Sequence, residues 1–266
     1  MADRLRDQRP RMGPGGSFVM VSGTVMKWTG LVLTCLSSLG VAVFQRGLLK
    51  MDAYATLEDL SQALADPGNG TMRLASAAVM CSLLAAMAVP LYAKLVYEGW
   101  KRGGNKRRLF LSLALCALAS EVPYDFAMNG ELMDWSVQNP AWGLLLCAAM
   151  LEVLSLPKSR SKAGVVLIRV LITAGALAWA VLLRVYVGAT LVLLAALFYF
   201  LEGRRGLSTL GGVVLTVPQF PAPFGMLFVH WYEPDAEEDG RYPNLFYILY
   251  PAQLLAFGAA GMLLRH

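Results

Sequence analysis

The sequence predicts an all-α membrane protein, a polytopic bundle of about eight transmembrane helices that forms one domain. Of the 266 residues, 57% are hydrophobic and only 15% are charged, whereas soluble domains average about 45–50% and about 25%. Such a chain has too little polar surface to coat a soluble globule. Apolar runs of about 20 residues, long enough to cross a bilayer, recur along the chain. They lack the polar–apolar alternation of membrane-barrel strands, so helices are expected.

The apolar runs give the spans in order. Residues 1–25 are expected to form a basic, flexible N-terminal tail, and residues 26–266 the transmembrane domain. No clear small-residue cleavage site follows the first run, which is therefore expected to be an uncleaved span. Arg184 marks a turn, because the 163–201 block is too long for one helix. The expected spans are 27–45, 74–96, 109–128, 140–156, 163–183, 185–201, 207–229 and 243–264.

The basic residues predict the orientation. With the N-terminus in the cytoplasm, the basic segments 4–11, 101–108 and 158–162 all fall on the inner side, as in most membrane proteins. Eight spans then place both termini in the cytoplasm. Since these residues are spread over separate loops, with no basic face interleaved with aromatic rings, nucleic-acid binding is not expected.

Two carboxylates in the third span are candidate catalytic residues. Glu121 lies about 18 Å along a helix that starts at Leu109, and Asp125 follows one turn later. Pro123 should interrupt this helix and free backbone groups that a cavity or a partner must satisfy. Ionisable groups at this depth usually face the bundle interior. Alternatively, the helix ends early and both carboxylates lie in a solvated outer loop.

Polar residues also occur in the second and last spans. Lys94 and Glu98 are four residues apart and could pair on one helix face. Alternatively, Lys94 extends to an ordinary membrane interface. Tyr247, Tyr250 and Gln253 surround Pro251 and could form the wall of a polar pocket. For Gln253, a hydrogen bond between helices is the alternative.

Cysteine and histidine give no sign of a metal site. The four cysteines all lie in apolar runs, where they are expected to pack as small side chains. There are two histidines, His230 at an outer helix end and the terminal His266. No metal-ligand spacing and no glycine-rich phosphate loop are present, so no metal cofactor is expected.

Several short motifs, in order along the chain, resemble the TraX family of membrane proteins. Lys27 and Gly40 fit its first-helix pattern, and the similarity runs from about residue 26 to 258. The other motifs are Glu98-Gly99, Ser120-Glu121-Val122-Pro123-Tyr124-Asp125, Gln138-Asn139 and Phe246-Tyr247-Ile248-Leu249-Tyr250-Pro251.

The resemblance implies a bacterial plasma-membrane protein linked to conjugative pilus systems. The family's namesake activity is N-terminal acetylation of pilin, and the family resembles the larger membrane acyltransferase family 3. Acetyl-CoA is then the expected acyl donor, with a pilin-like or small-molecule acceptor. The pocket residues implied by the resemblance are Lys27, Ser37, Ser38, Glu98, Gln138, Asn139, Tyr247, Tyr250 and Gln253. A basic loop could contact the donor's phosphates, or its charge could serve topology alone; its residues are Lys101, Arg102, Lys106, Arg107 and Arg108.

The chain also departs from the family pattern. Ser37 and Ser38 stand where the family carries an Asp-His pair, and Gln253 stands where it carries a histidine. Serine and glutamine cannot accept a proton at neutral pH, so acyl transfer should be weakened unless Glu121 or Asp125 replaces the missing base. Three functions stay open: a weakened acyltransferase, a catalytically silent accessory protein, and a small-molecule transporter.

Overall fold

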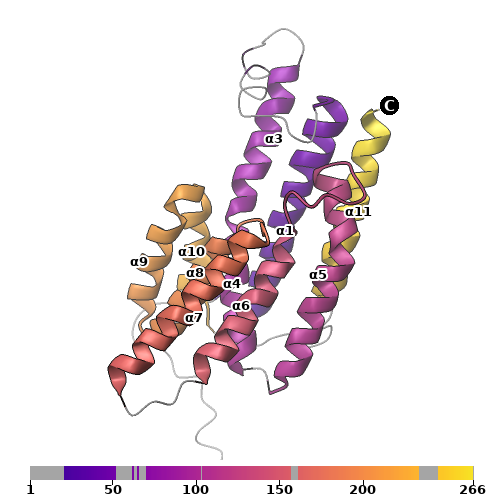
Figure 1. Cartoon of the computed structure of the whole chain (residues 1–266). Helices are drawn as coiled ribbons and strands as arrows, with labels where there is room; N and C mark the ends of the chain where they lie inside the picture. Colours follow the sequence, from indigo (N-terminus) through magenta and orange to yellow (C-terminus); the bar gives the residue numbers. More distant parts are fainter. Residues whose placement is uncertain are drawn as a thin grey trace, which may run out of the picture.

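All regular structure in the described part of the chain is helical. The computed structural model describes residues 21–51, 62, 65, 70–102, 104–156, 161–233 and 245–265. Among them the only extended pairings are two isolated bridges, Val21 with Tyr232 and Gln138 with Val185. The all-α prediction is confirmed (Figure 1). Most of the expected N-terminal tail lies outside the described residues, and the first helix begins at Gly23.

Five helices are long and apolar enough to cross a membrane, which supports the membrane assignment. Two of them are compound, because α1 continues as the π-helix η2 and α3 continues as α4. The helices are α1 (Gly23–Ser38), η2 (Leu39–Leu48), α3 (Thr71–Ala86), α4 (Ala88–Arg102), α5 (Lys106–Met128), α6 (Pro140–Ser155), α7 (Lys162–Leu182), α8 (Gly188–Phe200), α9 (Arg205–Thr216), α10 (Gly225–His230) and α11 (Leu245–Arg265). The helices α6 and α8 are apolar but shorter.

Short polar side chains set where several helices begin. Ser22, Asn105, Asn139 and Ser161 each accept a hydrogen bond from a backbone N–H in the first turn of α1, α5, α6 and α7. This capping satisfies donors that the helix itself leaves without a partner. The starts of these apolar helices are therefore encoded locally.

The long α3–α4 span is interrupted at Met87. Pro90 has no N–H to donate to the carbonyl four residues earlier, so the helical hydrogen-bond pattern is broken near this point. Gly225, the first residue of α10, packs against the break. A Cβ at this position would collide with the Met87 carbonyl, so the close approach requires glycine.

The expected membrane span 207–229 is wrong, because this segment is not one continuous helix. The segment is a hairpin in which α9 and α10 lie side by side, joined by two 3₁₀ turns at Val217–Gln219 and Ala222–Phe224. Three prolines, Pro218, Pro221 and Pro223, prevent a continuous helix there. At the other end, Arg205 Nη2 donates to the Tyr232 carbonyl at 3.1 Å. The segment therefore returns to the end of the bundle from which it started.

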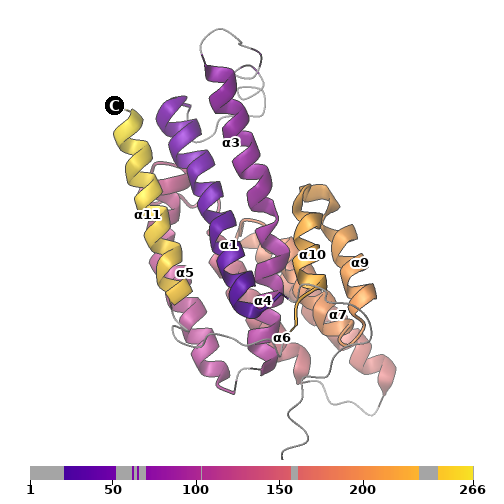
Figure 2. The same cartoon turned by 180° about the vertical axis from the view of Figure 1, so that it is seen from behind.

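The hairpin changes where the chain ends. The rings of Trp28 and Phe246 are 5.0 Å apart, so α1 and α11 begin side by side. At their other ends, a Cβ on Gly47 would lie 3.0 Å from the Gly261 carbonyl oxygen. The two helices are therefore parallel, and Arg265 lies at the opposite end of the bundle from the start of α1 (Figure 2). This does not fit the expectation that both termini lie on one side.

The helices form two groups. In one, α11 packs against α5 and η2, and α3 packs against α1 and η2. Glycines allow very close contact here, since a Cβ on Gly261 would collide with the Ala42 backbone and one on Gly258 with the Phe126 ring. Small residues have the same role in many membrane interfaces. The second group contains α4 and α6 to α10 (Figure 1), and its core includes Leu151, Leu194 and Phe198.

Candidate functional site

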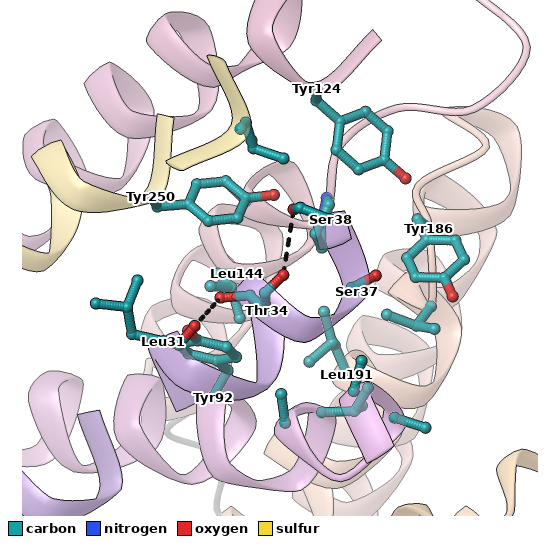
Figure 3. A pocket seen from close by; sticks show the side chains of 18 of the residues that line it. Leu31, Thr34, Ser37, Ser38, Tyr92, Tyr124, Leu144, Tyr186, Leu191 and Tyr250 are labelled. Carbon is teal, nitrogen blue, oxygen red and sulfur yellow. Dashed lines mark hydrogen bonds between the residues drawn. The ribbon is translucent and has the colours of Figure 1, made fainter. Parts of the chain in front are cut away.

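A cavity of about 1070 Å³ lies between the two groups of helices. Its wall extends along the first span from Lys27 to Gln45 and includes side chains of α3, α4, α5, α6, α11 and the hairpin tip. Most of the wall is apolar. A polar belt crosses its middle (Figure 3), formed by Thr34, Ser37, Ser38, Tyr92, Tyr124, Tyr186, Tyr250 and Gln253.

The first span changes from α-helix to π-helix at the polar belt. Ser38 is the last residue of α1, and η2 follows for ten residues. The Ser38 hydroxyl donates to the Thr34 carbonyl at 3.2 Å, and the Thr34 hydroxyl donates to the Leu31 carbonyl at 2.9 Å. The Tyr250 hydroxyl points toward Ser38 from α11 (Figure 3). Because π-helices are rare and occur often at functional sites, this junction is the centre of the candidate site.

Gln253 supplies the least satisfied polar group of the belt. Its amide nitrogen and amide oxygen are both buried, and neither has a hydrogen-bond partner among the described residues. Buried amides in folded proteins are almost always paired. The amide is thus available to a bound molecule, to which it can offer a donor and an acceptor together.

The structure brings together pocket residues that the family resemblance implied and that come from opposite ends of the sequence. Ser37 and Ser38 from α1 and Tyr247, Tyr250 and Gln253 from α11 all line the cavity. These positions are more than 200 residues apart, and the parallel packing of the two helices places them at similar depth. Apart from the polar belt, Lys27 and Glu98 also line the cavity.

Glu121 and Asp125 are placed elsewhere. The helix α5 continues through Pro123 to Met128, so neither carboxylate lies in an outer loop. Neither belongs to the cavity wall either. Glu121 accepts hydrogen bonds from Asn139 Nδ2 and, at 2.8 Å, from Trp142 Nε1, whereas Asp125 Oδ2 accepts from the Asp134 N–H at 2.8 Å. Both carboxylates therefore tie α5 to the 129–139 loop and the start of α6.

Gln138 and Asn139, in the same region, form hydrogen bonds with the backbone of neighbouring segments. The Gln138 N–H donates to the Arg184 carbonyl, and the Gln138 carbonyl accepts from the Tyr186 N–H, both at 3.0 Å. Asn139 is fully buried, caps α6 and donates to the Ala117 carbonyl at 3.1 Å. Neither residue lines the cavity. They join the loop before α6 to α5 and to the α7–α8 turn.

The end of the cavity near the start of α1 is charged. Glu98 is 6% exposed, and its carboxylate pairs with Lys94 at 2.7 Å and with Arg102 at 3.0 Å. The expected pairing of Lys94 with Glu98 is confirmed. The Lys94 ammonium also lies over the rings of Tyr97 and Phe198, at 4.9 and 5.3 Å from their centroids. Lys27, Glu98 and Arg102 line this end, which we term the inner mouth.

The basic loop next to the inner mouth is largely paired with carboxylates. Lys101 pairs with Glu202 at 2.7 Å, and Lys106 pairs with Glu152 at 2.6 Å. Arg107 and Arg108 are exposed. Of the five candidate donor-binding residues, Arg102 alone lines the cavity in the described structure.

Sequence reasoning missed several residues of the site. Tyr92, Tyr124 and Tyr186 belong to the polar belt, and the only sequence signal was a tyrosine within or next to an apolar run. It also missed Arg46, which is 9% exposed and whose Nη1 donates to the Phe126 and Ala127 carbonyls at 2.9 and 3.0 Å. This guanidinium satisfies the C-terminal end of α5, where the helix dipole favours a cation. The signal was a single arginine near the end of an apolar run.

The apolar helices and the internal polar belt define a helical membrane protein with a cavity between its helices. A family model described as TraX protein matches residues 22–260. The chain therefore belongs to the TraX family, as its motifs indicate. No curated protein and no solved structure matches the chain.

Proposed function

We propose that the chain is a TraX-type protein of the bacterial plasma membrane that binds an acyl donor such as acetyl-CoA in the cavity and transfers the acyl group only slowly. Family membership supports an association with conjugation. The acceptor is a pilin-like protein or a small molecule that reaches the polar belt.

We also propose a topology of seven crossings and one re-entrant hairpin. The crossings are α1 with η2, α3 with α4, α5, α6, α7, α8 and α11, and the hairpin is α9 with α10. With the start of α1 in the cytoplasm, the basic residues of the α4–α5 loop and Arg204 and Arg205 all lie at the inner end, as the positive-inside rule requires. Arg265 then lies at the outer end.

The donor is proposed to enter through the inner mouth. Lys27 and Arg102 lie there, and cationic side chains of this kind bind phosphate groups. Ser38 is eleven residues beyond Lys27, about 16 Å along the helix. An acyl group extending from the inner mouth can therefore reach the polar belt.

One observation carries the proposal of slow transfer. The described cavity wall contains no histidine, and its one carboxylate, Glu98, is held at the inner mouth by Lys94 and Arg102. At the belt, Ser38 and Tyr250 can donate hydrogen bonds to the carbonyl oxygen of a bound acyl group. No side chain there can take the proton that the attacking amine or hydroxyl must lose. A positioned base contributes about 10²–10⁴-fold.

A catalytically silent accessory role is the second candidate. It is favoured by the carboxylates that neutralise the basic loop, since Lys101 and Lys106 are already paired with Glu202 and Glu152. In this case the fold and cavity are kept, and the donor does not bind at the inner mouth.

Labelled acetyl-CoA and the purified full chain, with and without a pilin-like peptide, test the proposal. We expect saturable donor binding with little turnover. The triple change Ser37→Asp, Ser38→His and Gln253→His should raise turnover by about 10²-fold or more. The matched control is Ser37→Ala, Ser38→Ala and Gln253→Ala, which should not raise it.

Three results would count against the proposal. High turnover by the unmodified chain would refute slow transfer. Absence of donor binding would favour the accessory role. A triple variant that melts like the parent but gains no turnover would show that the cavity no longer has the geometry of a transferase.

A further inference from the structure

The cavity is larger and more apolar than an acetyl donor requires. Its volume of about 1070 Å³ slightly exceeds the roughly 300–1,000 Å³ typical of small-molecule sites. An acetyl group at the polar belt would fill only a small part of it. The remaining wall is mainly aliphatic and includes Leu31, Val79, Leu83, Val89, Leu144 and Leu191.

Part of this wall is exposed at the depth of the lipid tails. Leu83 of α3 and Phe220 at the hairpin tip both line the cavity, yet they are 38% and 64% exposed. Leu83 is twelve residues from the start of α3 and Phe220 is fifteen from the start of α9, about 18–22 Å from opposite ends of the bundle. Both therefore fall within the roughly 30 Å hydrocarbon layer.

The packing of α3 is sparse on its cavity side at this level. The helix α3 packs against α1 and η2 and contacts the hairpin turn at Ala222–Phe224. In the described structure it has no extensive packing against α6 or α8, whose residues Leu144 and Leu191 line the facing wall. We call the exposed part of the cavity wall around Leu83 and Phe220 the lateral window.

We propose that the acyl chain of a membrane phospholipid enters the cavity through the lateral window. A long apolar chain complements the aliphatic wall, and the polar belt limits how far along the cavity it can extend. The proposal rests on the cavity of the proposed function, but it does not require acyl transfer.

Photo-crosslinking tests this proposal. The full chain is placed in vesicles of equal parts phosphatidylethanolamine and phosphatidylglycerol that contain a phosphatidylethanolamine with a diazirine on its acyl chain. Crosslinked peptides are then identified by mass spectrometry. We expect crosslinks to residues 31–38 of α1 and to the cavity face of α4, in addition to those on the outer faces of the helices.

Two variants and a control locate the route of entry. Leu83→Trp narrows the window and should lower crosslinking inside the cavity by about tenfold, since extra volume there obstructs the chain. Phe220→Ala widens the window and should preserve or raise it. Leu171→Trp places the same new side chain on the exposed face of α7, at a residue 62% exposed and outside the cavity wall, and should change nothing.

The outcomes separate this proposal from the proposed function. Crosslinks confined to outer faces, or cavity crosslinks that Leu83→Trp leaves unchanged, would overturn entry through the window. A diazirine acyl-CoA added from the aqueous side provides the second arm. Cavity labelling by acyl-CoA alone would overturn the lipid proposal and leave the proposed donor binding in place. Cavity labelling by the lipid without acetyl-CoA binding would support the lipid proposal and overturn the proposed donor binding.

Discussion

Replacing Arg46 with methionine should measurably destabilise the fold. The Arg46 guanidinium donates to two carbonyls at the end of α5, and Gly130 leaves the space that it occupies, since a Cβ there would collide with Nη2. Arg46→Met keeps an apolar stem of similar shape but leaves both carbonyls without this partner.

The magnitude follows from the two hydrogen bonds. Bonds to a charged group are worth about 1.5–3 kcal/mol each, so the pair is worth about 3–6 kcal/mol. Polar contacts inside membrane proteins fall toward the low end of their range, and we take about 3 kcal/mol as the loss in the free energy of unfolding. For a chain of this size that corresponds to a fall in Tm of roughly 6–12 °C.

The assay is thermal melting of the purified protein in detergent, followed by intrinsic fluorescence. Arg73→Met is the matched control, because Arg73 is an exposed arginine on α3 at the same end of the bundle. Its Tm should change little. If Arg46→Met melts like Arg73→Met, the guanidinium does not hold the end of α5 and the reasoning is wrong.

Three further predictions concern topology, the inner mouth and the third span. A reporter fused after Arg205 should report the cytoplasm and one fused after Arg265 the exterior, because the α9–α10 hairpin does not cross; matching signals would refute the seven-crossing topology. Glu98→Gln should lower the free energy of unfolding in a melting assay by about 1.5–3 kcal/mol, since it removes the counter-ion of the partly buried Lys94, and adding Lys94→Met should restore much of it; no rescue would contradict this cause. Glu121→Leu should destabilise by about 2–4 kcal/mol by leaving two donors unpaired, while acetyl-CoA binding, measured by equilibrium dialysis, stays unchanged; a loss of binding in the folded variant would place Glu121 in the site after all.

Much of the fold could be predicted because a lipid environment requires long apolar helices. Such helices can be recognised in the sequence as long apolar runs. The hairpin could not be predicted from hydropathy, because an apolar run has the same mean hydropathy whether it crosses or turns back. The available signal was the spacing of Pro218, Pro221 and Pro223 in the middle of the run. In the topology that we propose, the hairpin also moves Arg265 to the other side of the membrane.

The site was predictable only in part. Ser37, Ser38, Tyr250 and Gln253 were singled out by resemblance, and they meet at the cavity. Glu121 was singled out because a carboxylate is costly at that depth, but this cost does not determine the direction in which the side chain points. The helix α5 has apolar residues on all sides, so its rotation about its own axis is not readable from the sequence. That rotation turns Tyr124, and not Glu121, toward the cavity.

The glycine contacts of α11 determine which helices can move relative to one another. The backbones of Gly261 and Ala42 are in close contact, and Gly258 packs on the Phe126 ring, so η2, α5 and α11 approach one another more closely than larger residues at these two positions would allow. They should move as one stiff unit. Any movement that admits a bulky molecule is then expected at α3, which ends at the interruption at Met87 and which, on the side away from α1 and η2, contacts the hairpin turn at Ala222–Phe224.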